Sequence, residues 1–238
     1  MKIVTWNCNG ALRNKFEHIA KLDADIYIVQ ECEDPDRARH KGYQEWSSNY
    51  IWKGRNKNKG IGIFCRGDIQ IQYLSWPSGS LELFLPIRIN DEFNLVGVWT
   101  KQAKSPNFRY IGQFWKFLQD HWRSMAKEPV IIAGDFNSNT RWDEWDRWWN
   151  HSDVVNQLAS LNIHSLYHSW HNEEQGEESI PTLYLQRKKE KPYHIDYIFT
   201  SKLIQDSIQD FKVGFHDDWI QLSDHMPIII QQENKCDK

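Results

Sequence analysis

The sequence has no long hydrophobic run. A transmembrane helix needs about 18 or more consecutive apolar residues, and every apolar run in this 238-residue chain is far shorter. The opening residues, MKIVTWNCNG, become polar after a short apolar run. We therefore expect a first β-strand there and not a secretory signal peptide. These features predict a cytoplasmic protein without a membrane segment.

Cysteine is also scarce. The four cysteines, Cys8, Cys32, Cys65 and Cys236, are scattered and form neither a CxxC pair nor a zinc-binding spacing. Three of them lie in or beside strand-like runs. We therefore expect free thiols in a reducing compartment and no zinc site.

Positive charge is not in excess. The chain has 29 Lys and Arg against 32 Asp and Glu, which gives a net charge of −3. This balance argues against tight nucleic-acid binding through overall charge, so any affinity for phosphate must come from local groups. The chain also contains no linker, repeat or low-complexity tract, so we expect residues 1–238 to form one domain. The sequence leaves the oligomeric state open.

What the sequence does contain is a series of short apolar runs bounded by turn residues, which predict β-strands. The runs are KIVTW (2–6), DIYIVQ (25–30), GIGIFCR (60–66), IQIQYLSW (69–76), LELFLPIRI (81–89), NLVGVW (94–99), PVIIAG (129–134), HIDYIF (194–199) and MPIII (226–230). An amphipathic pattern predicts a helix over residues 107–124, and shorter helices are expected at 13–21 and 151–161. Strands mixed with helices predict an α/β or α+β sandwich.

Polar side chains follow several of these strands. Asn7 and Asn9 come after the first strand, Glu31 after the second, and Asp135 and Asn137 after PVIIAG. Ligands collect at the carboxyl ends of strands in sheets that are flanked by helices. We therefore expect these side chains to share one edge of the sheet.

Three further groups precede strands instead. Asp196 lies near the start of HIDYIF, while Asp224 and His225 come before MPIII. A strand that runs in the opposite direction brings its amino end to the same edge. If the last strands are antiparallel to the first, all of these groups meet in one crevice.

Such a cluster of carboxylates needs a compensating cation. Oxygen and amide ligands without a thiolate favour Mg²⁺ or Mn²⁺. The ion polarises a phosphoryl oxygen and holds a water molecule for in-line attack. A nearby histidine that is oriented by a carboxylate can donate to the phosphate.

At this point five ordered stretches resemble the exonuclease–endonuclease–phosphatase superfamily. They are TWNCNG (5–10), QE (30–31), GDFNSN (134–139), HIDYIF (194–199) and SDHMPI (223–228), and they span almost the whole chain. The resemblance implies a four-layer sandwich of two mixed β-sheets packed face to face, with helices outside. It also implies phosphoester hydrolysis.

Carried over residue by residue, the resemblance implies a role for each matching position. Glu31 would be the principal metal ligand, with Asn7 beside it and Asp224 as a further metal-side carboxylate. Asp135 would position or deprotonate the attacking water, and Asn137 would hold the phosphate. His225, oriented by Asp196, would stabilise the pentacoordinate phosphate, and Asn9 falls where family members carry Asp or Asn.

The chain departs from the family at one place. Many nucleases of the family carry a Tyr or His after the strand that matches NLVGVW, followed by a Pro-Asn loop that touches the phosphate. This chain reads VWTKQAKSPNFRY there. Candidates for the substrate contact are therefore Trp99, Thr100, Gln102, Arg109 and Tyr110.

Three segments allow two interpretations each. The four tryptophans of TRWDEWDRWW (140–149) have helical spacing, so we expect a packing stripe, with a base-stacking wall beside Asn137 as the alternative. The basic segment KGRNKNKG (53–60) is predicted to be a solvated turn between strands; if extended, it would present one basic face. QRKKEK (186–191) is a solvated loop in one interpretation; because it leads directly into His194 and Asp196, the alternative is a contact with a phosphate backbone.

The sequence therefore predicts a Mg²⁺-dependent phosphoesterase that hydrolyses phosphodiester bonds by direct water attack, most simply a nuclease acting on DNA or RNA. One alternative is a phosphomonoesterase, or a phosphodiesterase for lipid headgroups or small molecules. Another is a catalytically inactive binding domain of the same fold, although the predicted set of side chains is complete. Polarity, endonucleolytic or exonucleolytic action, and the number of metals stay open.

Overall fold

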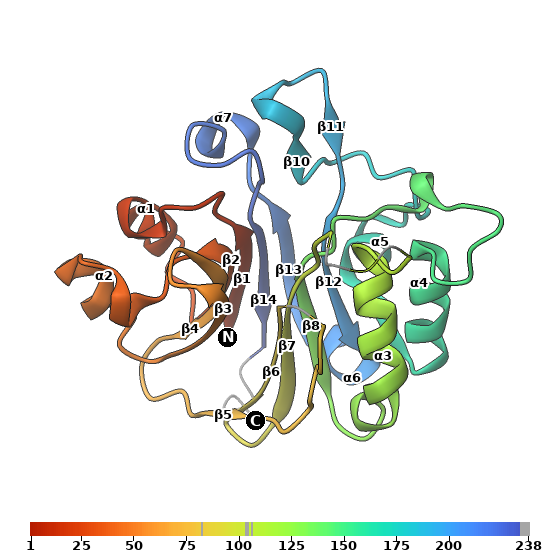
Figure 1. The fold of residues 1–238 in the computed structure, drawn as a ribbon, viewed down its shortest axis with the longest axis horizontal. Coiled ribbons are helices and arrows are strands. Elements are labelled where there is room, and N and C mark those ends of the chain that lie inside the picture. The colour runs from red at the N-terminus through yellow and green to blue at the C-terminus, as the bar shows by residue number, and fades with distance from the viewer. Residues whose placement is uncertain (82, 103–104, 106, 234–238) are drawn as a thin grey trace.

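Two six-stranded β-sheets packed face to face form the centre of the structure, and helices cover their outer faces (Figure 1). The structure is a computed structural model that describes residues 1–81, 83–102, 105 and 107–233. The predicted four-layer sandwich is confirmed. Among the described residues, no helix is both long and apolar enough to cross a membrane.

The first sheet, called sheet 1, carries the amino-terminal strands and the last two strands of the chain. In spatial order it contains β13 (Ile208–Val213), β14 (Ile228–Gln232), β1 (Lys2–Asn7), β2 (Ile26–Cys32), β4 (Lys59–Cys65) and β3 (Tyr50–Asn56). Strands β1 and β2 are parallel, and β14 runs antiparallel to β1.

The second sheet, called sheet 2, is built from the middle of the chain. Its spatial order is β5 (Ile71–Tyr73), β6 (Phe84–Ile89), β7 (Phe93–Trp99), β8 (Val130–Asp135), β12 (Asp196–Ser201) and β9 (Ile163–Ser165). Strands β7 and β8 are parallel, and β12 runs antiparallel to β8. The late strands β12 and β14 are therefore both reversed, as convergence of the polar groups requires.

Alternating side chains on the central strands explain the layers, because successive residues of a strand point to opposite faces. On β8, Ile131 and Ala133 face the core between the two sheets, whereas Val130 and Ile132 pack beneath the helices. Strand β2 alternates in the same way. Runs that are apolar on both faces therefore became central strands covered on both sides.

The helices surround the two sheets (Figure 1), and Leu166, Tyr167 and Ile204 from two of them join the core between the sheets. They are α1 (Phe16–Ala20), α2 (Lys41–Trp46), α3 (Ile111–Met125), α4 (His151–Ser160), α5 (Leu166–His171), α6 (Lys202–Gln205) and α7 (His216–Trp219). Short 3₁₀ turns occupy Leu12–Asn14, Pro35–Arg37, Thr140–Trp142 and Leu185–Arg187. A small hairpin, β10 (Leu183–Tyr184) with β11 (Pro192–Tyr193), rises above the sheets and carries the exposed QRKKEK segment.

Two predicted helices differ from the observed ones. The helix expected from residue 107 begins only at Ile111, because Tyr110 has a left-handed backbone (φ 49°) that a helix cannot contain. The helix expected over residues 13–21 is a 3₁₀ turn followed by the short α1. The segment 53–60 forms the end of β3, an exposed turn and the start of β4, as the turn interpretation predicted.

Gly134 fixes the end of β8. Its φ is 148°, and a Cβ at this position would lie 1.9 Å from the carbonyl oxygen of Val98 in β7. Only glycine allows the two strands to approach so closely. Gly134 therefore sets the position of Asp135, the next residue.

Candidate active site

Three polar side chains meet at one edge of the sandwich, where β1 and β8 end and where β12 begins. Asp135 continues the core-facing series of β8, and Asn7 continues that of β1. Asp196 opens β12 directly opposite Asp135 in the antiparallel register. All three are buried, so apolar strands end in polar groups that lie between the two sheets.

Asp135, Asp196 and His225 form a compact buried group, called the Asp–Asp–His cluster. One ligand atom from each lies within 4.8 Å of the others. His225 Nδ1 lies 2.9 Å from Asp196 Oδ2. Its Nε2 has no hydrogen-bond partner among the described residues, so this nitrogen can contact a substrate.

The carboxylate of Asp135 is held by amide groups from two directions. Asn7 Nδ2 donates to Oδ2 at 2.9 Å, and Asn137 Nδ2 donates to the same oxygen at 2.8 Å. The backbone N–H of Asn137 donates to Oδ1 at 2.8 Å, while Asn137 has a left-handed backbone (φ 46°) that closes this tight turn. The carboxylate is thus fixed before any substrate binds.

The segment that carries His225 is fastened to both sheets. The hydroxyl of Ser223 donates to the carbonyl of Asn7 at 2.7 Å and accepts the N–H of His225 at 3.0 Å. Trp6 Nε1 donates to the carbonyl of His225 at 3.0 Å. The imidazole is consequently anchored to β1 while it hydrogen-bonds to β12.

Thr182 connects the remaining parts. Its buried hydroxyl oxygen lies 3.0 Å from the backbone N–H groups of both Ile195 and Asp196, and its carbonyl accepts the N–H of Met226 at 2.7 Å. Sequence reasoning missed Thr182 and Ser223, because both support the cluster through contacts that are distant in sequence.

The electrostatics of the cluster follow from burial and charge. Burial, and then repulsion by Asp196, raises the pKa of Asp135 to about 7, against the opposing effect of His225. Burial alone would lower the pKa of His225, but the charge and hydrogen bond of Asp196 raise it to about 10. Near neutral pH the imidazole is therefore protonated, and Asp135 is only partly ionised.

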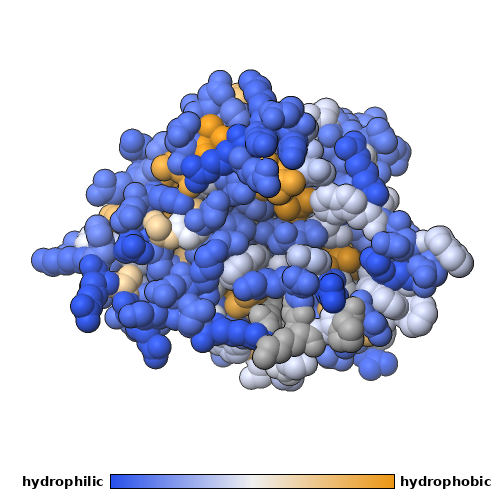
Figure 2. Space-filling model, turned by 45° about the horizontal axis from the view of Figure 1, so that its top comes forward, coloured by the Kyte–Doolittle hydropathy of each residue, from blue (hydrophilic) through white to orange (hydrophobic). Residues whose placement is uncertain are grey.

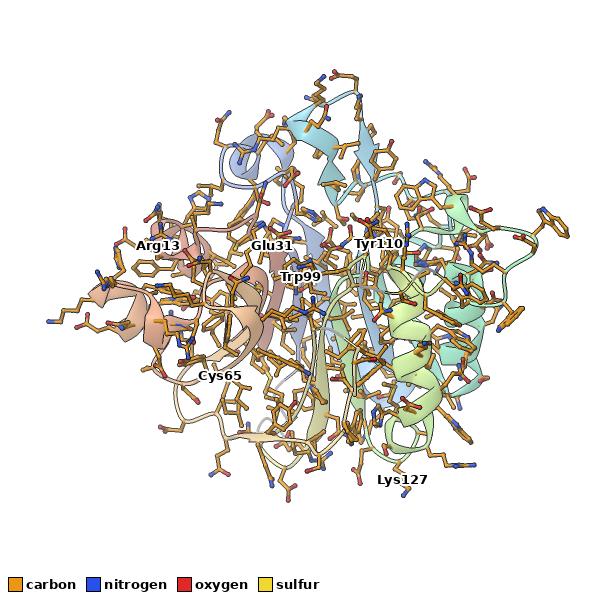
Figure 3. The ribbon with its side chains drawn as sticks, in the orientation of Figure 1. Arg13, Glu31, Cys65, Trp99, Tyr110 and Lys127 are labelled. Carbon is orange, nitrogen blue, oxygen red and sulfur yellow. The ribbon has the colours of Figure 1, made fainter. Side chains whose placement is uncertain are left out.

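Glu31, the predicted principal metal ligand, lies at the end of β2 and outside the Asp–Asp–His cluster. A β-bulge between Gln30 and Cys32 gives Glu31 a left-handed backbone (φ 63°) and redirects its side chain. Figure 3 shows Glu31 near the upper ends of the sheets, below the β10–β11 hairpin that forms the top of the molecule in this view. Its carboxylate pairs with Lys59 Nζ at 2.5 Å, so this position already attracts a cation.

The other two predicted metal-side residues lie beside this edge. Asp224 Oδ1 accepts Asn9 Nδ2 at 2.8 Å, and the N–H of Asn9 donates to Asn7 Oδ1 at 3.0 Å. The available donors, carboxylate and amide oxygens, suit a hard divalent cation. Glu31, Asn7 and Asp224 all offer donors of this kind at this edge. Among the described residues, the three members of the Asp–Asp–His cluster also place one ligand atom each close enough together to share an ion.

The predicted substrate-contact residues that follow β7 differ in their exposure. Thr100 is fully buried, and its hydroxyl donates to the carbonyl of Phe136. It therefore supports the turn around Asn137, whose Nδ2 also donates to the Thr100 carbonyl at 3.1 Å, and does not face a substrate. Arg109 and Tyr110, by contrast, are exposed and line a pocket of 610 Å³ together with Asn137.

This pocket is called the aromatic pocket. The tryptophan segment beside it does not form the predicted packing stripe. Residues 143–149 form a loop and not a helix, and Trp142, Trp145 and Trp148 are exposed instead of packed in a stripe. Trp149 does pack, against Phe108, with ring centroids 4.6 Å apart. Trp142 and Trp149 line the aromatic pocket.

Comparisons with known proteins agree with this geometry. The model of the endonuclease/exonuclease/phosphatase family matches residues 4–225. A 3′-5′ exonuclease from Neisseria meningitidis has a similar structure, with a TM-score of 0.72 at 20% identity over 98% of this chain and 100% of the other. The comparison with curated protein sequences found no match.

Two further structures show the same fold. A 3′ phosphatase from Neisseria bound to a product DNA hairpin has a TM-score of 0.70 at 19% identity, covering 98% of this chain and 100% of the other. An AP endonuclease from Archaeoglobus fulgidus has a TM-score of 0.69 at 16% identity, with the same coverage. With the family model matching almost the whole sequence, the chain belongs to the endonuclease/exonuclease/phosphatase family.

Proposed function

We propose that this protein is a divalent-metal-dependent phosphodiesterase that hydrolyses nucleic acid by direct attack of water. The Asp–Asp–His cluster carries this proposal. Two buried carboxylates face each other across β8 and β12, and the protonated imidazole of His225 compensates part of their negative charge. The raised pKa values of Asp135 and His225, in a buried cluster at the open edge of the sheets, support a chemical role for these side chains and not only a structural one.

Asp135 would accept a proton from the attacking water. As the water oxygen bonds to phosphorus, its proton passes to the carboxylate, and the bond between phosphorus and the leaving oxygen breaks. A pKa of about 7 suits a general base near neutral pH. The amides of Asn7 and Asn137 hold the carboxylate in place, so little reorganisation accompanies the transfer.

His225 would stabilise the charge that develops on the phosphate. Its Nδ1–H points to Asp196, which leaves Nε2–H to donate to a non-bridging oxygen. Because the imidazole stays protonated up to about pH 10, it can supply a full positive charge. Asp196 would then act by orienting and charging the ring.

A divalent cation, Mg²⁺ or Mn²⁺, would be held by Glu31, with Asn7 and Asp224 beside it. The ion would supply polarisation of a phosphoryl oxygen and neutralise negative charge in the transition state. Lys59 shows that Glu31 accepts a cationic partner in this position.

Nucleic acid is the proposed substrate class. The similar structures are named as an exonuclease, an AP endonuclease and a phosphatase that was bound to a DNA hairpin. The exposed side chain of Arg109, at the rim of the pocket beside Asn137, offers a local positive charge for a phosphate.

The proposal is tested with purified protein on four substrates: duplex DNA with an abasic site, single-stranded DNA, RNA and a soluble phosphomonoester. We expect Mg²⁺-dependent cleavage of at least one nucleic acid and loss of that cleavage in EDTA. Cleavage of the monoester alone would reject the nuclease assignment, and no cleavage of any substrate would favour an inactive domain.

A further inference from the structure

The aromatic pocket opens directly beside the candidate active site. Asn137 belongs to both, because its side chain donates to Asp135 while its surface lines the pocket. A phosphate placed next to Asp135 would therefore have one of its attached groups in the pocket. With 610 Å³, the pocket lies within the range of small-molecule sites.

Aromatic side chains from three separate segments line this pocket. Trp142 and Tyr193 contact each other with ring centroids 5.4 Å apart, and Tyr193 comes from the β10–β11 hairpin. Tyr110, at the start of α3, and Trp149 contribute from other elements. Figure 3 shows Tyr110 at the same height as Glu31, near the upper ends of the sheets. Flat aromatic walls suit a flat aromatic ligand.

The loop next to the pocket, residues 143–149, is called the tryptophan loop and projects beside α4 (Figure 1). Asn150 braces it from inside: Nδ2 donates to the carbonyls of Glu144 and Arg147, both at 2.9 Å, and Oδ1 accepts the N–H of Glu144 at 3.0 Å. Asp143 accepts the N–H groups of His151 and Ser152 at the start of α4. The loop is thus ordered by its own hydrogen bonds.

Two tryptophan side chains of this ordered loop are exposed to solvent. Trp145 is 98% exposed and Trp148 is 66% exposed. The surrounding face is largely hydrophilic, with only small apolar patches (Figure 2). Exposed indoles on a braced loop beside a reaction centre offer stacking surface that folding does not use.

The charges of the loop indicate which part of a nucleic acid it contacts. Asp143, Glu144 and Asp146 lie among the tryptophans, and Arg147 is paired with Glu144 at 3.3 Å. A phosphate backbone would be repelled there. The faces of bases carry no such charge, so the loop suits bases that have left a duplex.

We infer that the aromatic pocket and the tryptophan loop bind the bases of unpaired nucleotides next to the cleaved phosphate, so that the substrate is single-stranded or unpaired at that point. This inference rests on the proposed function, since it assumes a phosphodiester at Asp135. Base stacking on the indoles provides affinity without sequence preference.

Binding tests the inference separately from turnover. The variant Asp135→Asn is used because we expect it to hydrolyse the substrate at least about 100-fold more slowly. Fluorescence anisotropy measures its affinity for a labelled single strand, for the same strand in a duplex, and for a strand of equal length whose nucleotides lack bases. We expect the base-bearing single strand to bind about tenfold or more tightly than the other two.

Added substitutions locate the contact. Trp142→Ala and Trp145→Ala should each weaken single-strand binding by about fivefold or more. Trp170→Ala is the matched control, because Trp170 is 45% exposed, like Trp142, but lies outside the pocket. Trp145 is almost completely exposed, so its replacement cannot act through the core.

Three results would overturn the inference: equal binding of the baseless strand, preference for the duplex, or unchanged affinity in both tryptophan variants. Sedimentation of the protein with anionic lipid vesicles, lost in Trp145→Ala, would assign the loop to a membrane surface instead. Failure of the unmodified protein to hydrolyse any phosphoester would reject the proposed function and leave the binding result standing.

Discussion

Replacement of Asp196 by Asn should lower the pKa of His225, so that the imidazole loses its positive charge at a lower pH. The rise in the pKa of His225 from 6.5 to about 10 corresponds to roughly 5 kcal/mol in favour of the imidazolium, at 1.36 kcal/mol for each pKa unit. The charge of Asp196 and its hydrogen bond at 2.9 Å are the main sources of this stabilisation. Without them, burial is opposed only by the charges of Asp135 and Asp224, and we expect the pKa of His225 to fall well below 10.

The assay is an NMR titration of the histidine rings, with the His225 signals assigned by their loss in His225→Gln. In the unmodified protein the ring should stay charged from pH 6 to pH 9, whereas in Asp196→Asn it should be neutral at pH 8. Because the folded-state pKa lies above that of the unfolded chain, His225 stabilises the fold fully below pH 6.5. That contribution disappears as the pH rises through about 10.

The control is Asp217→Asn, which removes the carboxylate from an exposed pair in which His216 Nδ1 lies 2.6 Å from Asp217. This substitution should leave the titration of His225 unchanged. A His225 pKa within one unit of 6.5 in the unmodified protein would refute the electrostatic description of the cluster. So would a pKa that Asp196→Asn does not alter.

Three further predictions concern the site and its support. The rate of hydrolysis should rise with pH as Asp135 ionises near pH 7, and fall again as the buried imidazolium of His225 loses its proton. A bound divalent cation should move both limbs of the profile to lower pH. A flat profile from pH 5 to 9 would contradict these assignments. Lys59→Gln should raise Mn²⁺ affinity about two- to fivefold in calorimetry by removing the competing ammonium, and Glu31→Gln should lower it; unchanged heats in both variants would place the ion elsewhere. Thr182→Val should lower the free energy of unfolding by about 1–3 kcal/mol in denaturant titration, because two buried N–H groups lose their acceptor. Thr200→Val, which removes a buried hydroxyl that has no hydrogen-bond partner in the described part of the chain, is its control and should have little effect.

The sequence predicted most of the fold because the central strands are apolar on both faces and end in polar residues. Asn7 and Asp135 were identifiable for this reason. The reversal of β12 was a condition that the sequence could state but not establish, and the pairing of Asp196 opposite Asp135 depends on sheet register. Strands β3 and β13 were missed because they lie at sheet edges, where polar residues interrupt the apolar pattern.

Side-chain hydrogen bonds to the backbone explain the main error. The tryptophans from 142 to 149 have helical spacing, yet Asn150 and Asp143 bind backbone groups of the loop and of α4, and these bonds compete with a helix. The spacing of apolar residues predicts which face of an element is buried. It does not predict which backbone groups a side-chain amide or carboxylate will bind by hydrogen bonds. The support that Thr182 gives was hidden for the same reason.

The most direct measurement is the single-turnover rate of phosphodiester cleavage with saturating Mg²⁺, compared between the unmodified protein and Asp135→Asn. The amide keeps the size of the carboxylate but cannot accept the proton of the attacking water. We expect the rate to fall at least about 100-fold, the usual effect of losing a positioned base. Equal rates would show that the carboxylate of Asp135 takes no part in the reaction.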